Sequence, residues 1–221
     1  MVMEFFKAGA SNELDAVEAT IVQMLRDGND VFTTATDALF GGGTSKATKR
    51  EVRSTDMGIN EAQKDVRRSL LIHAAVGPTE LPLVLQYASI VKDAERIGDY
   101  SKNLYDLVKF GANFSEAPDC DELERYRNKV SNLIVDAADV FEAKDAPAAQ
   151  RLLGKADAFL DEYDMQVRAA YKSKGEVSDA VAHALYFRFL KRTTAHVMNV
   201  LTALVQPLDR LDSYDEAKED R

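Results

Sequence analysis

The sequence predicts an all-α protein made of two tandem antiparallel three-helix bundles, with six long helices in all. Only eleven Gly and five Pro occur in 221 residues. That is too few for a β sandwich or barrel, which needs a turn about every 8–12 residues. Apolar residues recur at three- and four-residue spacing, as in the stripe Ile59, Ala62, Val66, Leu70, which is the period of an amphipathic helix. Hydrophobic residues make up 46% of the chain, enough for a core.

Each expected helix has a start or stop signal in the sequence. Asn12 is a good N-cap for the first helix, and the run Gly41-Gly42-Gly43 follows its end. Thr79 is the expected cap of the third helix, and Asp145 is the expected cap of the fifth, with Pro in the first turn. The expected ranges are about 12–40, 44–76, 79–110, 119–143, 145–172 and 178–207.

The six helices fall into two sets of three, separated by the linker 111–118. Residues 54–61 align with 155–162, and in the third helix of each set Arg96 aligns with Arg192 and Asn103 with Asn199. Matches in equivalent helices indicate duplication. We therefore expect two repeats, residues 1–112 and 113–221, the second being the more degenerate.

Charge and cysteine content exclude several classes of protein. The net charge is −9 and the isoelectric point near 4.9, which disfavours nucleic-acid binding, since phosphates need a basic surface. The single cysteine excludes an intrachain disulfide or a Cys-rich zinc site. The N-terminus lacks the pattern of a signal peptide, and no stretch reaches 18 apolar residues. We expect a cytoplasmic protein.

The sharpest local feature is an acidic pair, Glu95 and Asp99, four residues apart on one helix face. Both lie opposite the apolar stripe and are expected to be exposed. Two like charges at this spacing destabilise a helix by about 0.3 kcal/mol, and Gly98 destabilises it by about 1 kcal/mol relative to Ala. A bound Mg, Mn, Ca or Fe ion would account for the pair, and Gly98 would let a neighbouring helix approach closely. The alternative is a solvated acidic face beside Lys92 and Lys102.

The segment 94–99, Ala-Glu-Arg-Ile-Gly-Asp, followed by Asn103, resembles the signature of the PhoU family. In that family an acidic residue and an Asp four positions later lie in the third helix of each three-helix repeat. The length, the six helices and the duplication agree with the family over nearly the whole chain. The resemblance implies a metal-binding, often homodimeric regulator of phosphate uptake, located in the cytoplasm at the inner face of the cell membrane.

The resemblance also implies the metal ligands. Glu95 and Asp99 match the family's carboxylates, Asp56 on the second helix stands where another acidic ligand often lies, and Asn60 is one turn further on. Family members most often hold polynuclear iron or zinc. Because oxygen ligands are hard, we expect Fe, Mn or Mg rather than Zn here.

The second repeat departs from the family pattern. Lys191 stands where Glu95 does in the first repeat, and Ala195 stands where Asp99 does. Asp157 and Asp161 remain on the preceding helix, where the Lys191 charge is expected to neutralise them. We predict a metal cluster in the first repeat and at most a second, weaker site at Asp157 and Asp161.

We expect a regulator that is not an enzyme, because no catalytic arrangement of residues is apparent in the sequence. We consider three functions, of which only the last is enzymatic. The first is an adaptor that binds an ABC-type phosphate transporter, with or without a sensor histidine kinase, through peripheral membrane association. The second is an accessory regulator of a Pit-type or sodium–phosphate carrier. Residues 205–212 faintly resemble the family members that accompany such carriers. The third is a metal-dependent phosphohydrolase using metal-bound water.

Two further features have a structural interpretation and a functional one. Lys46, Lys49, Arg50 and Arg53 form a basic cluster, which is either a solvated face or a docking patch for an acidic partner or anionic lipid headgroups. We expect His73 in the core and His196 at the surface, and the alternative for each of them is contact with a metal ion.

Overall fold

The computed structural model describes residues 2–76 and 80–212, and the side chains of residues 13–75 and 80–212. Within these ranges every long element is helical and no strand occurs, which confirms the predicted all-α class. The six helices are α1 (Val2–Asp37), α2 (Lys46–Val76), α3 (Leu81–Lys109), α4 (Cys120–Glu142), α5 (Ala146–Tyr171) and α6 (Val177–Thr202). A π turn (Ala38–Gly42) extends α1, and a 3-10 turn (Leu208–Arg210) follows α6.

The predicted helix ends agree with the structure at most places and fail at two. The predicted cap Asp145 accepts a hydrogen bond from the backbone N–H of Ala148 at 2.9 Å. The first helix begins at Val2 rather than near Asn12, because the segment before Asn12 contains no Pro to stop it. The sixth ends at Thr202 rather than near residue 207. The predicted cap Thr79 lies outside the described residues.

The glycine run after the first helix makes the turn into α2. Gly41 has a φ of 109° and Gly43 a φ of 62°, a backbone region that side chains with a Cβ rarely adopt. Ser45 then caps α2, its Oγ accepting a hydrogen bond from the N–H of Thr48 at 2.9 Å.

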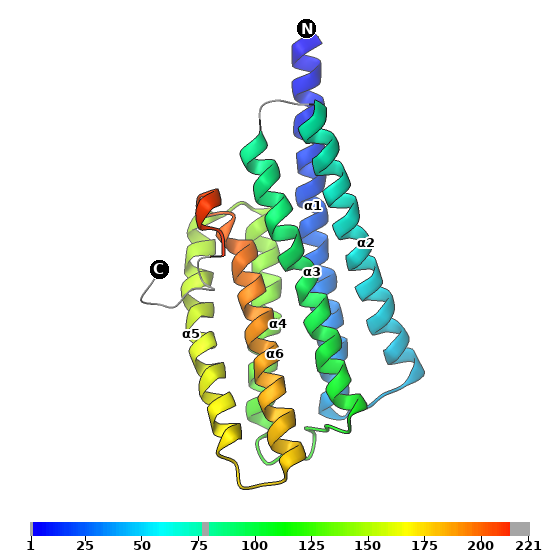
Figure 1. The fold of residues 1–221 in the computed structure, drawn as a ribbon, viewed down its shortest axis with the longest axis vertical. Coiled ribbons are helices and arrows are strands. Elements are labelled where there is room, and N and C mark those ends of the chain that lie inside the picture. The colour runs from blue at the N-terminus through cyan, green and yellow to red at the C-terminus, as the bar shows by residue number, and fades with distance from the viewer. Residues whose placement is uncertain (1, 77–79, 213–221) are drawn as a thin grey trace.

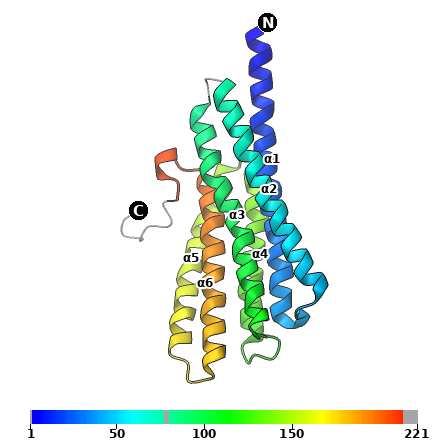
Figure 2. The same ribbon diagram turned by 45° about the vertical axis from the view of Figure 1, so that its right-hand side comes forward.

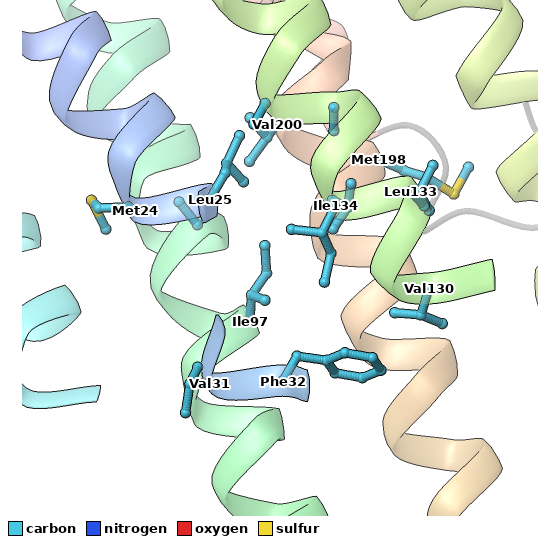
Figure 3. Packing of buried hydrophobic residues seen from close by; sticks show 14 of the residues in the cluster. Met24, Leu25, Val31, Phe32, Ile97, Val130, Leu133, Ile134, Met198 and Val200 are labelled. Atoms are coloured by element: carbon cyan, nitrogen blue, oxygen red, sulfur yellow. The ribbon is translucent and has the colours of Figure 1, made fainter. Parts of the chain in front are cut away.

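The helices form two antiparallel three-helix bundles that lie side by side (Figures 1 and 2). α3 packs on α6 and α1 packs on α4, so that four helices join the halves. One continuous hydrophobic cluster runs through both. Figure 3 shows Phe32 of α1 and Ile97 of α3 facing Ile134 of α4 within it. The repeat bounds 1–112 and 113–221 stay a prediction, with the boundary falling between α3 and α4.

Candidate metal centre

The candidate site lies where α2 and α3 come close together, and Gly98 makes this approach possible. A Cβ on Gly98 would lie 3.2 Å from Cδ1 of Ile59 and 3.5 Å from Oδ1 of Asp56. A contact at 3.2 Å is tighter than about nine in ten real Cβ contacts. The predicted role of Gly98 is therefore confirmed: its missing side chain lets α2 press its Asp56 turn against α3.

A lysine ammonium bridges the two helices at this point. Nζ of Lys102 lies 3.0 Å from Oδ1 of Asp56 and 2.9 Å from Oδ1 of Asp99. The side chain of Asp56 is only 10% exposed, so its charge needs a partner. Asn60, one turn further along α2, donates from Nδ2 to Oδ2 of Asp56 at 3.2 Å. The chain itself thus places a positive charge between carboxylates of α2 and α3.

The second carboxylate of the motif, Glu95, lies beside Asp99 under the guanidinium of Arg96. Arg96 contacts Asp99 at 2.8 Å (Nη1 to Oδ2) and Glu95 at 3.8 Å (Nε to Oε2). Burial raises the pKa of the Glu95 carboxyl above its usual value, and the charge of Asp99 and a hydrogen bond to it act in the same direction. Arg96 and Lys102 oppose this shift in the pKa of Glu95. Glu95 therefore holds a proton more tightly than an isolated glutamate.

The expectation that this acidic pair is exposed is wrong. The side chain of Glu95 is 12% exposed and that of Asp99 is 25% exposed. The prediction assumed that α3 has one buried face, whereas α3 packs on α1, α2 and α6. α2 covers only part of the face opposite the apolar stripe. The two carboxylates are therefore half-buried beside the α2–α3 interface, whereas Lys92 and Arg96 stay exposed.

The donors at the site suit a hard cation, because they are carboxylate and amide oxygens. The Lys102 ammonium between Asp56 and Asp99 shows that a cation is accommodated there. In the described part of the chain, however, no three His, Cys, Asp or Glu side chains converge closely enough to hold a metal ion. The site as it stands is neutralised by Lys102 and Arg96.

Comparison with known proteins identifies the first half of the chain. The model of the PhoU domain matches residues 21–108, which include all of these carboxylates. Residues 21–108 form a PhoU domain. The family resemblance read from residues 94–99 is thereby confirmed, and the PhoU domain spans the end of α1, α2 and α3 with the candidate centre at its α2–α3 interface.

Solved PhoU structures share the fold of both halves. The phosphate transport system regulatory protein PhoU from Streptococcus pneumoniae superposes with a TM-score of 0.78 at 18% identity, covering 90% of this chain and 96% of that one. PhoU from Pseudomonas aeruginosa superposes with a TM-score of 0.75 at 22% identity, covering 90% and 98%. The fold is therefore PhoU-like beyond the matched domain. No curated protein matches the sequence.

The helices after the PhoU domain lack its acidic pair, as the sequence indicated. Nζ of Lys191 lies 2.6 Å from Oδ2 of Asp164 on α5, and Ala195 is buried. Asp157 and Asp161 lie on the same helix as Asp164. Lys191 thus holds an acidic partner on α5 one turn from Asp161, and the second, weaker metal site at Asp157 and Asp161 stays a prediction.

The sequence analysis missed a buried polar pair where the PhoU domain meets α6. Nδ1 of His196 lies 2.7 Å from Oδ1 of Asp93, and Asn199 donates to the same oxygen at 3.2 Å. Both members of the pair are buried, and Tyr100 stacks on the His196 ring at 5.6 Å between centroids. The expectation that His196 lies at the surface is therefore wrong, because α6 is buried against α3 there.

A signal for this burial exists in the sequence. Residues 193–202, Thr-Thr-Ala-His-Val-Met-Asn-Val-Leu-Thr, form a ten-residue run without Lys, Arg, Asp or Glu. A helix without charge on any side is typical of burial all round. All ten of these residues are buried in the structure, which includes the polar ones that a search for apolar stripes passes over.

The remaining candidate residues are placed as follows. The predicted core position of His73 is confirmed, and its Nδ1 lies 3.5 Å from Oε2 of Glu13. The basic cluster is brought together on the surface of α2, where its members line one shallow hollow with Met57; the cluster consists of Lys46, Lys49, Arg50 and Arg53.

Proposed function

We propose that this chain regulates phosphate transport through contact with a phosphate transporter. The observation that supports this most directly is the PhoU domain match over residues 21–108, with its Glu95–Asp99 motif. A further support is the fold over both halves, shared with a phosphate transport system regulatory protein. The chain has no described helix long and apolar enough to cross a membrane, so it would reach a transporter as a peripheral protein at the inner face of the membrane.

The proposed partner is an ABC-type phosphate transporter, with a sensor histidine kinase as a further partner. A Pit-type or sodium–phosphate carrier is the alternative, which rests on the sequence of residues 205–212. Homodimer formation belongs to the same proposal, because the family resemblance implies it. A molar mass measured by light scattering distinguishes the monomer of 24.5 kDa from a dimer.

We further propose that Asp56, Asn60, Glu95 and Asp99 hold a metal ion, with Fe, Mn or Mg favoured over Zn. The ammonium of Lys102 occupies the place between Asp56 and Asp99, so binding would exchange one cation for another. A bound ion would tie α2 to α3 more strongly than Lys102 does, since it takes several oxygens at once. Asn60 already orients Asp56 for this role through its hydrogen bond.

The phosphohydrolase alternative has less support. Among the described carboxylates of the motif, Asp99 is bound by both Arg96 and Lys102, and Glu95 lies against Arg96. Carboxylates paired in this way are arranged to neutralise charge rather than to activate a water molecule. We therefore assign the centre a structural or regulatory role.

Deletion and complementation in the source organism test the proposed function. Phosphate uptake is followed with radioactive phosphate in cells grown at high and low phosphate. We expect uptake to lose its dependence on external phosphate when the gene is deleted, and to regain it with the wild-type gene. A Glu95→Gln/Asp99→Asn variant should restore it poorly, whereas Glu116→Gln, an exposed residue outside the site, should restore it fully. Unchanged regulation in the deletion strain would contradict the proposal.

A further inference from the structure

Positive charge is concentrated on one helix of this acidic protein. α2 holds seven Lys and Arg residues against four Asp and Glu, whereas the whole chain carries a net charge of −9. All seven cationic side chains are exposed: Lys46, Lys49, Arg50, Arg53, Lys64, Arg67 and Arg68.

Most of these cations have no carboxylate partner. Lys64 pairs with Glu61 at 2.7 Å and Arg68 pairs with Asp65 at 2.6 Å, each within one turn of α2. The other five form no ion pair with any described residue. An uncompensated row of this kind on an acidic protein attracts an anionic surface.

Large apolar side chains interrupt the row of cations. Met57 is 66% exposed and Leu71 is 71% exposed. At 100° per residue both fall in the same arc of about 60° of the helix as five of the cations. We call this arc the outer face of α2; it comprises Lys46, Arg50, Arg53, Met57, Lys64, Arg68 and Leu71.

The outer face is long, and none of the other helices covers it within the residues that the structure describes. From Lys46 to Leu71 it extends for about 38 Å at 1.5 Å per residue. α2 packs mainly on α1 and α3, and Figures 1 and 2 show it at the edge of the molecule, away from α4–α6. A flat partner can therefore approach the whole row at once.

We propose that the outer face of α2 docks on an anionic lipid bilayer. A bilayer presents phosphate groups continuously, so that it neutralises the unpaired cations Lys46, Arg50 and Arg53. It also extends to Lys64 and Arg68, whose ion pairs with Glu61 and Asp65 are exposed and therefore weak. Met57 and Leu71 can enter the boundary between headgroups and acyl chains, as apolar residues of interfacial helices do. An acidic protein would neutralise Arg50 and Arg53 equally well, but its charged surface offers these apolar side chains nothing to enter.

Docking in this way gives α2 two working faces. Asp56 lies on its inner side against Lys102 of α3, while the outer face rests on lipid. The bilayer contact needs neither a metal ion nor a transporter. A failure of the proposed phosphate regulation would therefore leave it standing, and the reverse also holds.

Vesicle co-sedimentation of the full chain tests the inference. The probes are vesicles with one third phosphatidylglycerol in phosphatidylcholine, vesicles of phosphatidylcholine alone, and a polyglutamate peptide. We expect binding to the anionic vesicles only, and a steep loss of binding above ~0.1 M salt, where the Debye length falls below about 10 Å. A Lys46→Gln/Arg50→Gln variant, which removes two unpaired cations of the outer face, should lower the partition coefficient roughly 25-fold, from about 1 kcal/mol per cation.

Two further variants separate lipid from other anions. Arg151→Gln/Lys155→Gln removes the same charges at the same spacing from the exposed side of α5 and should leave binding unchanged. Met57→Gln/Leu71→Gln keeps every charge and should weaken vesicle binding several-fold, about 5-fold or more. Equal binding to neutral vesicles, equal loss in both charge variants, or binding to polyglutamate without binding to vesicles would overturn the proposal.

Discussion

Asp93 of α3 and His196 of α6 form a buried pair across the interface that joins the two halves, with Oδ1 of Asp93 2.7 Å from Nδ1 of His196. The other carboxylate oxygen of Asp93 is buried without a hydrogen-bond partner among the described residues. The polar contact is thus poorly satisfied on one side, and its partner Asn199 also comes from α6. The pair fixes which side chains of α3 face which of α6.

Breaking this pair should destabilise the protein strongly. His196→Phe leaves the Asp93 carboxylate buried with Asn199 as its remaining neutral donor, at a cost of about 3 kcal/mol in the free energy of unfolding. Asp93→Leu/His196→Phe removes both polar groups and should recover most of that loss. Urea unfolding of the two variants and the wild type measures the coupling. Equal stability of the single and double variants would show that the pair contributes nothing specific.

Gly98 should be replaceable once Ile59 is shortened. Alanine is the better helix former by about 1 kcal/mol, but its Cβ would lie 3.2 Å from Cδ1 of Ile59. Ile59→Val removes that methyl group. We therefore expect Gly98→Ala to stabilise the Ile59→Val background by up to about 1 kcal/mol. In the wild type the same change should give a smaller gain in stability, or a loss of stability. Thermal unfolding of the four proteins checks this, and an equal gain in both backgrounds would contradict the close approach of the helices.

The raised pKa of Glu95 gives the metal-free protein a defined pH dependence. The folded state binds the Glu95 proton more tightly than the unfolded chain does, so its contribution to stability is lost as the pH rises from the usual pKa of 4.5 through the raised one. Glu95→Gln should therefore stabilise the protein near pH 7 in EDTA by about 0.3–0.5 kcal/mol, the size of a like-charge pair at this spacing.

The gain in stability from Glu95→Gln should disappear below about pH 4, near the usual pKa of glutamate, because the carboxyl is then protonated in both the folded and the unfolded state. Glu116→Gln, at an exposed position, should show no such dependence. Melting temperatures across this range test the sign. A gain that grows toward low pH would contradict the raised pKa.

Lys102 should compete with metal ions for the acidic site. Lys102→Met leaves Oδ1 of the buried Asp56 without its ammonium, which should cost about 1–3 kcal/mol without metal. The same change removes the competing cation and should raise the affinity for Mn²⁺ about fivefold, the equivalent of about 1 kcal/mol. Lys109→Met is the matched control, because the described partners of Lys109, Asp106 and the ring of Tyr105, both lie on its own helix. An affinity that falls in Lys102→Met would count against exchange at this site.

The elements of the fold were readable from local signals, because caps and breakers act within a few residues. Asp145 and its following Pro fix the start of α5 wherever that helix packs. The burial of Glu95 was not readable in this way. A helical wheel shows which residues share a face, but not how many neighbours the helix has, and α3 has three.

The polar contacts across helices depended on tertiary register. Lys102 entered the sequence analysis only in the alternative interpretation, as a neighbour of a solvated acidic face, yet its side chain reaches 46 positions back along the chain to Asp56. Asp93 and His196 lie on stripes whose partners are set only when the two halves pack together. The uncharged run around His196 indicated burial, but it did not name Asp93 as the partner.

Calorimetric titration of Mn²⁺ into the chelator-treated protein tests the metal centre most directly. We expect heat of binding in the wild type and in Asp157→Asn/Asp161→Asn, and none in Asp56→Asn/Asp99→Asn, since only the last removes oxygens from both sides of the α2–α3 interface. The absence of heat in the wild type, or undiminished heat in Asp56→Asn/Asp99→Asn, would contradict the assignment of a cation to these side chains.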